Sequence, residues 1–293
     1  MTEIEMYRAA CRAAAAARDH GAALIKPGMS LLELAEEVEA LIVRKGAKPA
    51  FPTNISMNDV AAHFTPLSSE KGRFSNGMLV KLDVGAHVNG RIGDTAVTVE
   101  VGTKRWGSLI AASTQALSAA AELLRPGLEM RYVGAAVERT ITSFGYKPIS
   151  NLTGHSMTPY ELHSGINVPN VLDDNRQTIA PGEIVAVEPF ATNGLGRVKS
   201  HKNSGIYRLV RPPLEKEIAQ FPLLMEIQRE FRTLPFAERW CARMESHAQR
   251  ILSKLVRRGI ITYYPILMEA GGGMVSQAEH TLQITEKGAA VLT

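Results

Sequence analysis

Two aspartates flank an Asn-Gly dipeptide in the stretch KLDVGAHVNGRIGDTAVTV, residues 81–99. The residues around Asp83 and Asp94 alternate between apolar and polar types, which is the pattern of paired strands. Asn-Gly favours a two-residue hairpin turn, and that turn sets Gly85 opposite Asp94 with Asp83 diagonal to it on the same face. Two ionised carboxylates held in this way need a cation, a shared proton or bulk water.

Four further side chains of ligand type occur downstream in unusual surroundings. His155 and His163 lie among glycines and turn residues in TGHSMTPYELHSGINVPNV, a setting typical of functional loops. Glu188 ends the apolar run GEIVAVEPF, and Glu279 occupies a similar place in SQAEHTLQIT. A charge in such a run is costly unless it is paired or coordinated.

The donor types in these segments suit a metal. One imidazole and four carboxylates match divalent Mn, Fe, Co or Zn. Four carboxylate charges roughly balance two divalent ions, so the residues predict a paired-metal site. Solvated aspartates on a surface hairpin and structural histidines are the alternative interpretation.

An internal repeat organises the elements that must position these side chains. IKPGMSLLELAEEVEALIVRKGAKP, residues 25–49, aligns without a gap with LRPGLEMRYVGAAVERTITSFGYKP, residues 124–148. Each copy predicts a Pro-Gly turn, an amphipathic helix, a glycine stop and a Pro-led extended segment. A looser match beyond each copy aligns Asp83 with Glu188. The repeat predicts a duplicated α+β half.

Composition and charge limit the class of protein. A chain of 293 residues with 45% hydrophobic residues can bury a sizeable core, and no run of eighteen apolar residues predicts a spanning helix. We expect a soluble, cytoplasmic protein. Cys11 and Cys241 lack a partner motif, which predicts two free thiols. Residues 194–258 hold fourteen Lys and Arg against six Glu, typical of a solvated helical face or of a nucleic-acid footprint.

Four segments in one order resemble the methionine aminopeptidases of the pita-bread metallopeptidase family: KLDVGAHVNGRIGDTAVTV, NLTGHSMTPYELHSGINVPN, VAVEPFAT and AEHT. The 90 residues between Glu188 and Glu279 are similar to the helical insertion of type II enzymes, in their short archaeal form. The resemblance covers essentially the whole chain. It implies an α+β fold in which two pseudo-twofold halves form a curved antiparallel sheet, with helices on its outer side and metals between the halves.

The resemblance also implies two domains and a role for each ligand. Residues 1–194 and 272–293 would form the catalytic domain, and residues 195–271 an inserted helical subdomain. The ligand set would hold two divalent ions (Co, Mn, Fe or Zn), with Asp83 on one ion, Asp94 and Glu279 bridging both, and His155 and Glu188 on the other. Such a pair can lower the pKa of a water, polarise the first peptide bond of the substrate and anchor its free amine.

Further residues complete the implied site. Glu188 would shuttle the proton to the leaving amine. His63 and His163 would contact the scissile peptide and stabilise the oxyanion. Three residues match lining positions of an apolar methionine pocket, which suits an unbranched thioether: Phe51, Leu162 and Phe190. Small second residues of the substrate are favoured because bulk there would clash near the metals.

Two other functions compete with this one. Prolidases and aminopeptidases P share the five-ligand pattern but usually carry a domain before the catalytic half, for which the residues before Asp83 leave no room. Other pita-bread relatives bind ribosomes or nucleic acid after losing their ligands. LVRRGIITYYPILMEAGGGMVSQ, residues 255–277, predicts helix, strand, Gly-rich turn and strand, like the wing of a winged-helix module. All five ligand types are present, which favours the peptidase.

The expected partners are nascent polypeptide N-termini, with a transient ribosome contact through the basic segment. We expect no membrane partner and no specific nucleic acid. Nothing in the sequence demands a dimer, so we expect a monomer.

Overall fold

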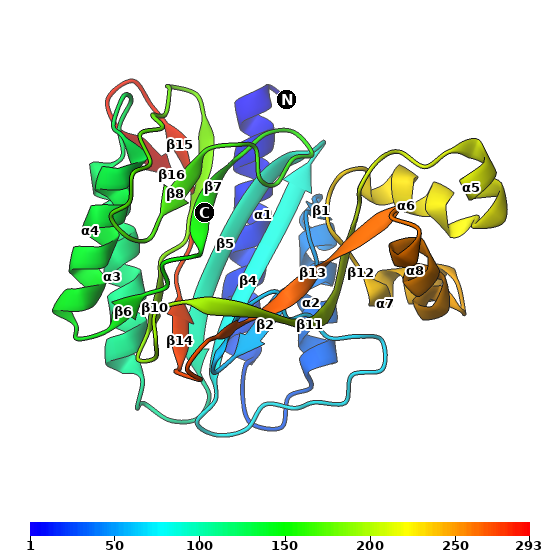
Figure 1. Cartoon of the computed structure of the whole chain (residues 1–293), viewed down its shortest axis with the longest axis horizontal. Coiled ribbons are helices and arrows are strands. Elements are labelled where there is room, and N and C mark those ends of the chain that lie inside the picture. The colour runs from blue at the N-terminus through cyan, green and yellow to red at the C-terminus, as the bar shows by residue number, and fades with distance from the viewer.

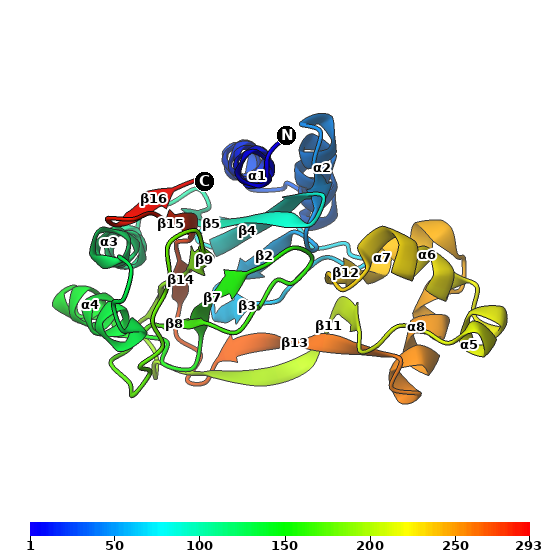
Figure 2. The ribbon, with the colours of Figure 1, turned by 90° about the horizontal axis from the view of Figure 1, so that it is seen from above.

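Two helix pairs cover the outer side of a curved antiparallel sheet (Figure 1), and the view from above separates them from strands that cross its inner side (Figure 2). The structure is a computed structural model that describes residues 1–293. The outer helices are α1 (Glu3–Leu24), α2 (Leu31–Arg44), α3 (Gly107–Leu123) and α4 (Met130–Ser143). No helix of the chain combines the length and the apolar character needed to cross a membrane.

The two helix pairs confirm the predicted duplication. Helix α4 begins and ends 99 residues after α2, as the alignment of the two copies requires. The glycine stops Gly46 and Gly145 both have φ of 81°, the left-handed conformation that ends helices. Each is followed by a two-residue strand, β1 (Lys48–Pro49) and β6 (Lys147–Pro148). Shared turn chemistry therefore produced the same local structure twice.

Each half contributes its own group of strands. The first group contains β1, β2 (Asn54–Met57), β4 (Leu79–Val88) and β5 (Arg91–Glu100). The second contains β7 (Thr153–Met157), β8 (Asn167–Pro169), β9 (Ile184–Val187), β15 (His280–Ile284) and β16 (Ala289–Val291). β10 (Phe190–Thr192) pairs with β6 and with β14 (Val275–Gln277). All these pairs are antiparallel, as the fold class predicted.

The hairpin of β4 and β5 has the predicted register. Its turn lies at Asn89 and Gly90, which both have positive φ, and Gly85 lies opposite Asp94. Helix α1 packs closely on this hairpin. A Cβ on Gly93 would lie 2.6 Å from the backbone of Cys11, so only glycine allows this approach.

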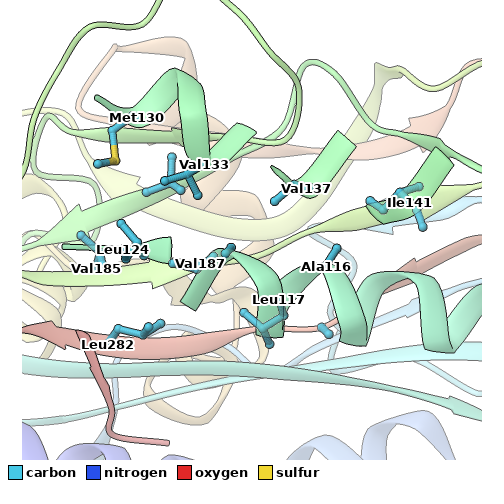
Figure 3. Close-up of a cluster of buried hydrophobic side chains, with 14 of the residues drawn as sticks. Ala116, Leu117, Leu124, Met130, Val133, Val137, Ile141, Val185, Val187 and Leu282 are labelled. Atoms are coloured by element: carbon cyan, nitrogen blue, oxygen red, sulfur yellow. The ribbon is translucent and has the colours of Figure 1, made fainter. Parts of the chain in front are cut away.

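Apolar clusters hold the helices on the sheet. Side chains of α3 and α4 meet those of β9 and β15 in one buried cluster (Figure 3), in which Leu117, Val137, Val185 and Leu282 are at most 4% exposed. An equivalent cluster joins α1 and α2 to β4. Burial of apolar surface contributes about 25 cal/mol per Å², so these two clusters are the main attachment of the outer layer.

Residues 195–271 form a long hairpin with four helices at its far end. Strands β11 (Val198–Leu209) and β13 (Ile261–Glu269) pair, and β13 also pairs with β3 (Val60–Ala62). Between them lie α5 (Glu215–Gln220), α6 (Leu223–Phe231), β12 (Phe236–Ala237), α7 (Glu238–Met244) and α8 (Ala248–Arg257). The helices enclose their own buried cluster beside the main body (Figure 1).

The expected wing over residues 255–277 is wrong in its pairing. The order of helix, strand, Gly-rich turn and strand is present, but β13 pairs with β11 whereas β14 pairs with β10. The buried carboxylate of Glu269 explains the difference, because it accepts backbone N–H groups from Leu195 and Gly196 as well as from Gly271 and Gly273. These hydrogen bonds fix the turn after β13, and β14 leaves this turn to pair with β10 in another sheet.

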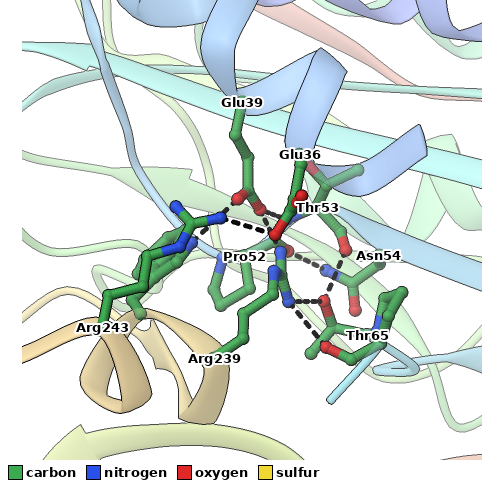
Figure 4. A network of polar contacts seen from close by, with 10 residues as sticks. Glu36, Glu39, Pro52, Thr53, Asn54, Thr65, Arg239 and Arg243 are labelled. Carbon is green, nitrogen blue, oxygen red and sulfur yellow. Dashed lines mark hydrogen bonds and ion pairs between the residues drawn. The ribbon is translucent and has the colours of Figure 1, made fainter. Parts of the chain in front are cut away.

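A buried ion pair joins the inserted helices to α2 (Figure 4). Arg239 of α7 donates to Glu39 of α2, and both are nearly inaccessible to solvent. The Glu39 carboxylate also accepts from Trp240 Nε1 at 2.8 Å and from the backbone N–H of Thr53 at 3.0 Å. Arg239 in turn donates to Thr65 Oγ1 at 2.7 Å. The network therefore fixes the segment that leads into β2.

Replacing Arg239 with methionine is expected to lower the free energy of unfolding by about 3–5 kcal/mol, because the Glu39 carboxylate would be left buried without its countercharge. Arg243→Met is the matched control. Arg243 pairs with Glu36 on the same two helices, but both side chains are more than 40% exposed. We expect the control to cost less than about 1 kcal/mol. Urea unfolding monitored by circular dichroism measures both, and equal losses would contradict the assignment.

Candidate metal centre

Strand pairing sets two candidate ligands of the first half, Asp83 and Asp94, on one face with Glu279. Asp83 of β4 lies opposite Ala96 of β5, and Ala96 forms a bridge with Glu279 just before β15. Directly opposed residues share a face, and so do residues two positions apart on one strand. Asp94, two positions before Ala96, therefore lies on the same face as Asp83 and Glu279.

The second half brings its ligands to this face by the same rule. His155 of β7 lies opposite Ala186 of β9, and Ala186 lies opposite Thr281 of β15. Thr281 Oγ1 accepts the backbone N–H of Asp94 at 2.8 Å and donates to its carbonyl, which joins the two halves. Glu188 follows Ala186 by two positions. All five predicted ligands thus face one another across the junction.

The ligand atoms converge in a buried cavity. His155 Nε2 lies 3.8 Å from Asp94 Oδ2 and 3.9 Å from Glu188 Oε1. One ligand atom from each of Asp94, His155 and Glu279 lies within 4.8 Å of the others. Asp83 and Glu188 line the same cavity. These distances between ligand atoms are longer than hydrogen bonds, so an ion could lie between the side chains.

The electrostatics of the cavity call for a cation. Burial raises the pKa of Asp83 to about 7. Burial, and then the neighbouring carboxylates, raise the pKa values of Asp94, Glu188 and Glu279 well above their ordinary range. Asp83 Oδ1 and Asp94 Oδ1 are buried and accept no hydrogen bond. A divalent ion would supply the missing partner, so the residues present fit a metal.

Gln277, which the sequence analysis missed, orients two of the carboxylates. Its Nε2 donates to Glu188 Oε2 at 3.2 Å and to Glu279 Oε2 at 3.3 Å. Its place two residues before Glu279, at the end of β14, is the signal that could have identified it, because alternate residues of an extended segment point to the same side. Partners of this kind hold ligand side chains in position.

The two predicted non-ligand histidines line the same cavity. His63 has a φ of 64° and its Nδ1 lies 3.2 Å from the carbonyl oxygen of Pro265. A carbonyl accepts only, so Nδ1 carries the proton and Nε2 is left as an acceptor. Burial lowers the pKa of His63 to about 4. Burial and the cation of Arg208 lower the pKa of His163, whose ring centroid lies 4.3 Å from that of His155.

The cavity wall differs in part from the expected one. Phe51 and Leu162 line it, whereas Phe190 packs in a buried cluster with Val198 and Val275 and does not line the cavity. Phe190 lies two residues past Glu188, and alternate residues share a face only while a strand continues. A break between β9 and β10 separates the two residues, so Phe190 faces away from the cavity. Five lining residues were not predicted: Asn54, Ala62, Ile206, Pro235 and Tyr264. Three of these come from residues 195–271, where no ligand or catalytic motif marks them.

The contribution of Asp83 to the stability of the metal-free protein is expected to fall as the pH rises from about 4 to 7. In this range the native state keeps a proton on Asp83 that the unfolded state has released, so this contribution to the free energy of unfolding decreases with rising pH. Asp83→Asn removes this effect and should be more stable than the unaltered protein by roughly 1–3 kcal/mol at pH 8, with the difference gone near pH 4. Urea unfolding of both proteins after chelator treatment tests this. The contributions of the buried histidines to the pH dependence are the same in both proteins and drop out of the difference. A difference that grew towards acid would contradict it.

Comparison with known proteins identifies related metallopeptidases, in agreement with a metal site. The model of metallopeptidase family M24 matches residues 5–286. The methionine aminopeptidase of Archaeoglobus fulgidus is 45% identical over 92% of this chain and 91% of its own length. That of Methanocaldococcus jannaschii is 44% identical over 99% of both. The crystal structure of the methionine aminopeptidase of Thermotoga maritima superposes with a TM-score of 0.73 over 99% of this chain and 96% of that one, at 24% identity, which shows a shared fold.

Proposed function

The chain belongs to metallopeptidase family M24, and from that premise we propose that it removes the N-terminal methionine from polypeptides whose second residue is small. The observation that carries the proposal is the convergence of Asp83, Asp94, His155, Glu188 and Glu279 in one buried cavity. These residues would hold two divalent ions of the Co, Mn, Fe or Zn class. When bound, such ions supply a nucleophilic water near neutral pH and polarise the scissile carbonyl.

Glu188 would handle the proton of the reaction. Its carboxylate is held by Gln277, and burial raises its pKa, so it can take a proton from the attacking water and donate it to the leaving amine. Water adds to the carbonyl carbon, the bond between carbon and nitrogen breaks, and the amine leaves with this proton. The reaction needs no other reactant.

The two non-ligand histidines would position the scissile peptide. His163, neutral at physiological pH because its pKa is lowered, can donate a hydrogen bond to the carbonyl oxygen, on which charge develops. His63 is proposed to accept the peptide N–H through Nε2, because Pro265 fixes its Nδ1 as the donor. Opposite hydrogen-bonding roles on the two sides of the cavity would hold the peptide in one orientation.

The methionine side chain would lie against Phe51 and Leu162, which line the cavity together with Ile206. Apolar walls of this kind suit an unbranched thioether, whereas a charged side chain would lose its hydration without gaining a partner. The restriction to small second residues is proposed to follow from crowding beside the metal ligands.

The discriminating experiment compares two peptides with metal-reconstituted protein. Methionine release from Met-Ala-Ser and no cleavage of Ala-Pro is the expected result. Cleavage of Ala-Pro with no release of methionine would instead support a prolidase or aminopeptidase P activity. No hydrolysis of either peptide, with the metals bound, would favour a ribosome-binding or nucleic-acid-binding protein.

The partners and the place of action are part of the same proposal. The protein is proposed to act in the cytoplasm as a monomer on nascent polypeptides. The excess of basic residues between 194 and 258 motivates a transient ribosome contact. Co-sedimentation with ribosomes at low salt that weakens as salt rises would support this contact, and its absence at every salt concentration would count against it.

A further inference from the structure

A second hollow continues from the metal cavity towards the inserted helices. It has a volume of about 600 Å³ and shares four lining residues with the metal cavity: Leu162, His163, Pro235 and Tyr264. Because the free amine of a substrate would lie at the metals, the rest of its chain must leave the cavity by an open side. Because the two cavities share these lining residues, the second hollow forms a continuous path by which the substrate chain could leave the metal cavity.

Strand β11 leads from one hollow into the next. Ile206 lines the metal cavity, and Arg208, Leu209 and Val210, at the end of the strand, line the second hollow. Alternate residues of a strand share a face and advance by about 6.7 Å per pair. An extended substrate advances at the same rate, so a substrate that runs beside β11 with its first residue at the level of Ile206 would bring its third residue to the level of Arg208.

The charges along this path are predominantly positive. Arg208 is exposed and makes no ion pair, and Glu161 is the one acidic residue lining the second hollow. A third hollow follows, which shares Leu209, Val210 and Thr233 with the second. It is lined by Arg232, whose guanidinium lies 4.2 Å from the ring centroid of Tyr160 and makes no ion pair. The path therefore carries two unpaired cations against one carboxylate.

We propose that the second hollow binds the outgoing part of the substrate polypeptide, and that Arg208 makes the enzyme favour acidic side chains at the third and fourth residues. This rests on the proposed function, since it requires a substrate whose N-terminus lies at the metals. The groups involved are exposed and screened by water, so the preference for acidic over basic peptides is about 3- to 10-fold in kcat/KM. It falls as salt rises, because exposed charges are screened within about 8–10 Å at physiological salt.

The test uses three amidated peptides with acidic, neutral or basic side chains at the third and fourth residues: Met-Ala-Glu-Glu-Gly, Met-Ala-Gln-Gln-Gly and Met-Ala-Lys-Lys-Gly. Metal-loaded protein should cleave them in that order of kcat/KM, with the differences mainly in KM. Arg208→Gln should bring the three rates together, and Arg208→Glu should reverse the order. A reversed order cannot result from misfolding, which lowers all three rates alike. Arg250→Gln is the matched control, because Arg250 is an exposed arginine of the inserted helices outside the hollows.

Each outcome supports or overturns the proposal. Release of methionine at equal rates from all three peptides, or an unchanged order in Arg208→Glu, would overturn the role of Arg208 while leaving the proposed function intact. No release from any peptide would overturn the proposed function itself. If Arg208→Gln weakened binding of a labelled single-stranded RNA and left the peptide order unchanged, the hollow would serve RNA and the proposal would be wrong.

Discussion

Replacing Asp94 with alanine is expected to lower methionine release from Met-Ala-Ser by roughly 10³-fold or more, which is about 4 kcal/mol of transition-state stabilisation. Asp94 lies between the two halves of the site, with its Oδ2 beside His155 and its Oδ1 without any protein partner. Its loss would remove a donor that is proposed to bridge the two ions, and one of the four negative charges that would balance them. Metal content measured by mass spectrometry should fall together with activity.

The fold should survive this substitution. The backbone hydrogen bonds between Asp94 and Thr281 do not use the carboxylate, and removing a buried negative charge relieves repulsion in the metal-free state. Thermal unfolding of the metal-free variant should therefore occur at or above the temperature of the unaltered protein. Asp19→Ala, on the exposed side of α1, is the matched control and should change neither property. Retention of more than a tenth of the activity by Asp94→Ala would exclude a bridging role.

Replacing His163 with alanine is expected to lower kcat by about 10²- to 10³-fold while metal content stays unchanged. The imidazole lines the cavity and is proposed to donate a hydrogen bond to the developing oxyanion, so its loss should affect the transition state more than the ground state. Steady-state kinetics with Met-Ala-Ser, together with metal analysis of the same samples, measures both quantities.

His155→Ala is the matched comparison for His163→Ala, because the two ring centroids lie only 4.3 Å apart. Removing His155 takes away a neutral nitrogen donor within 4 Å of two carboxylates, so metal content and activity should fall together. If His163→Ala lost metal to the same extent as His155→Ala, His163 would be a ligand and the assignment of roles would be wrong.

Much of the two duplicated halves could be predicted from short-range patterns. The Asn-Gly turn fixed the register that places Gly85 opposite Asp94, because two-residue turns allow few strand alignments. Pro-Gly and glycine signals at both ends of the repeat gave α2 and α4 matching bounds. The family resemblance then supplied what no local pattern contains, which is that Glu279 meets Asp83 from the far end of the chain.

The residues that the sequence did not reveal come from contacts between distant segments. Arg239 meets Glu39 two hundred residues away, and neither has a sequence neighbourhood that marks it as buried. The error at Phe190 has the same origin, since a break between two short strands changed the face it occupies. Spacing along the chain predicts a face only while a strand continues without a break.

The sequence by itself determined the duplicated halves, the hairpin register and the types of the metal-binding residues, because turn chemistry, periodicity and ligand chemistry are properties of neighbouring residues. The tertiary structure alone decided how the hairpin of β11 and β13 closes the cavity and which charges line the way out of it. Those features depend on packing between segments far apart in the chain, where many side chains of similar type could have served.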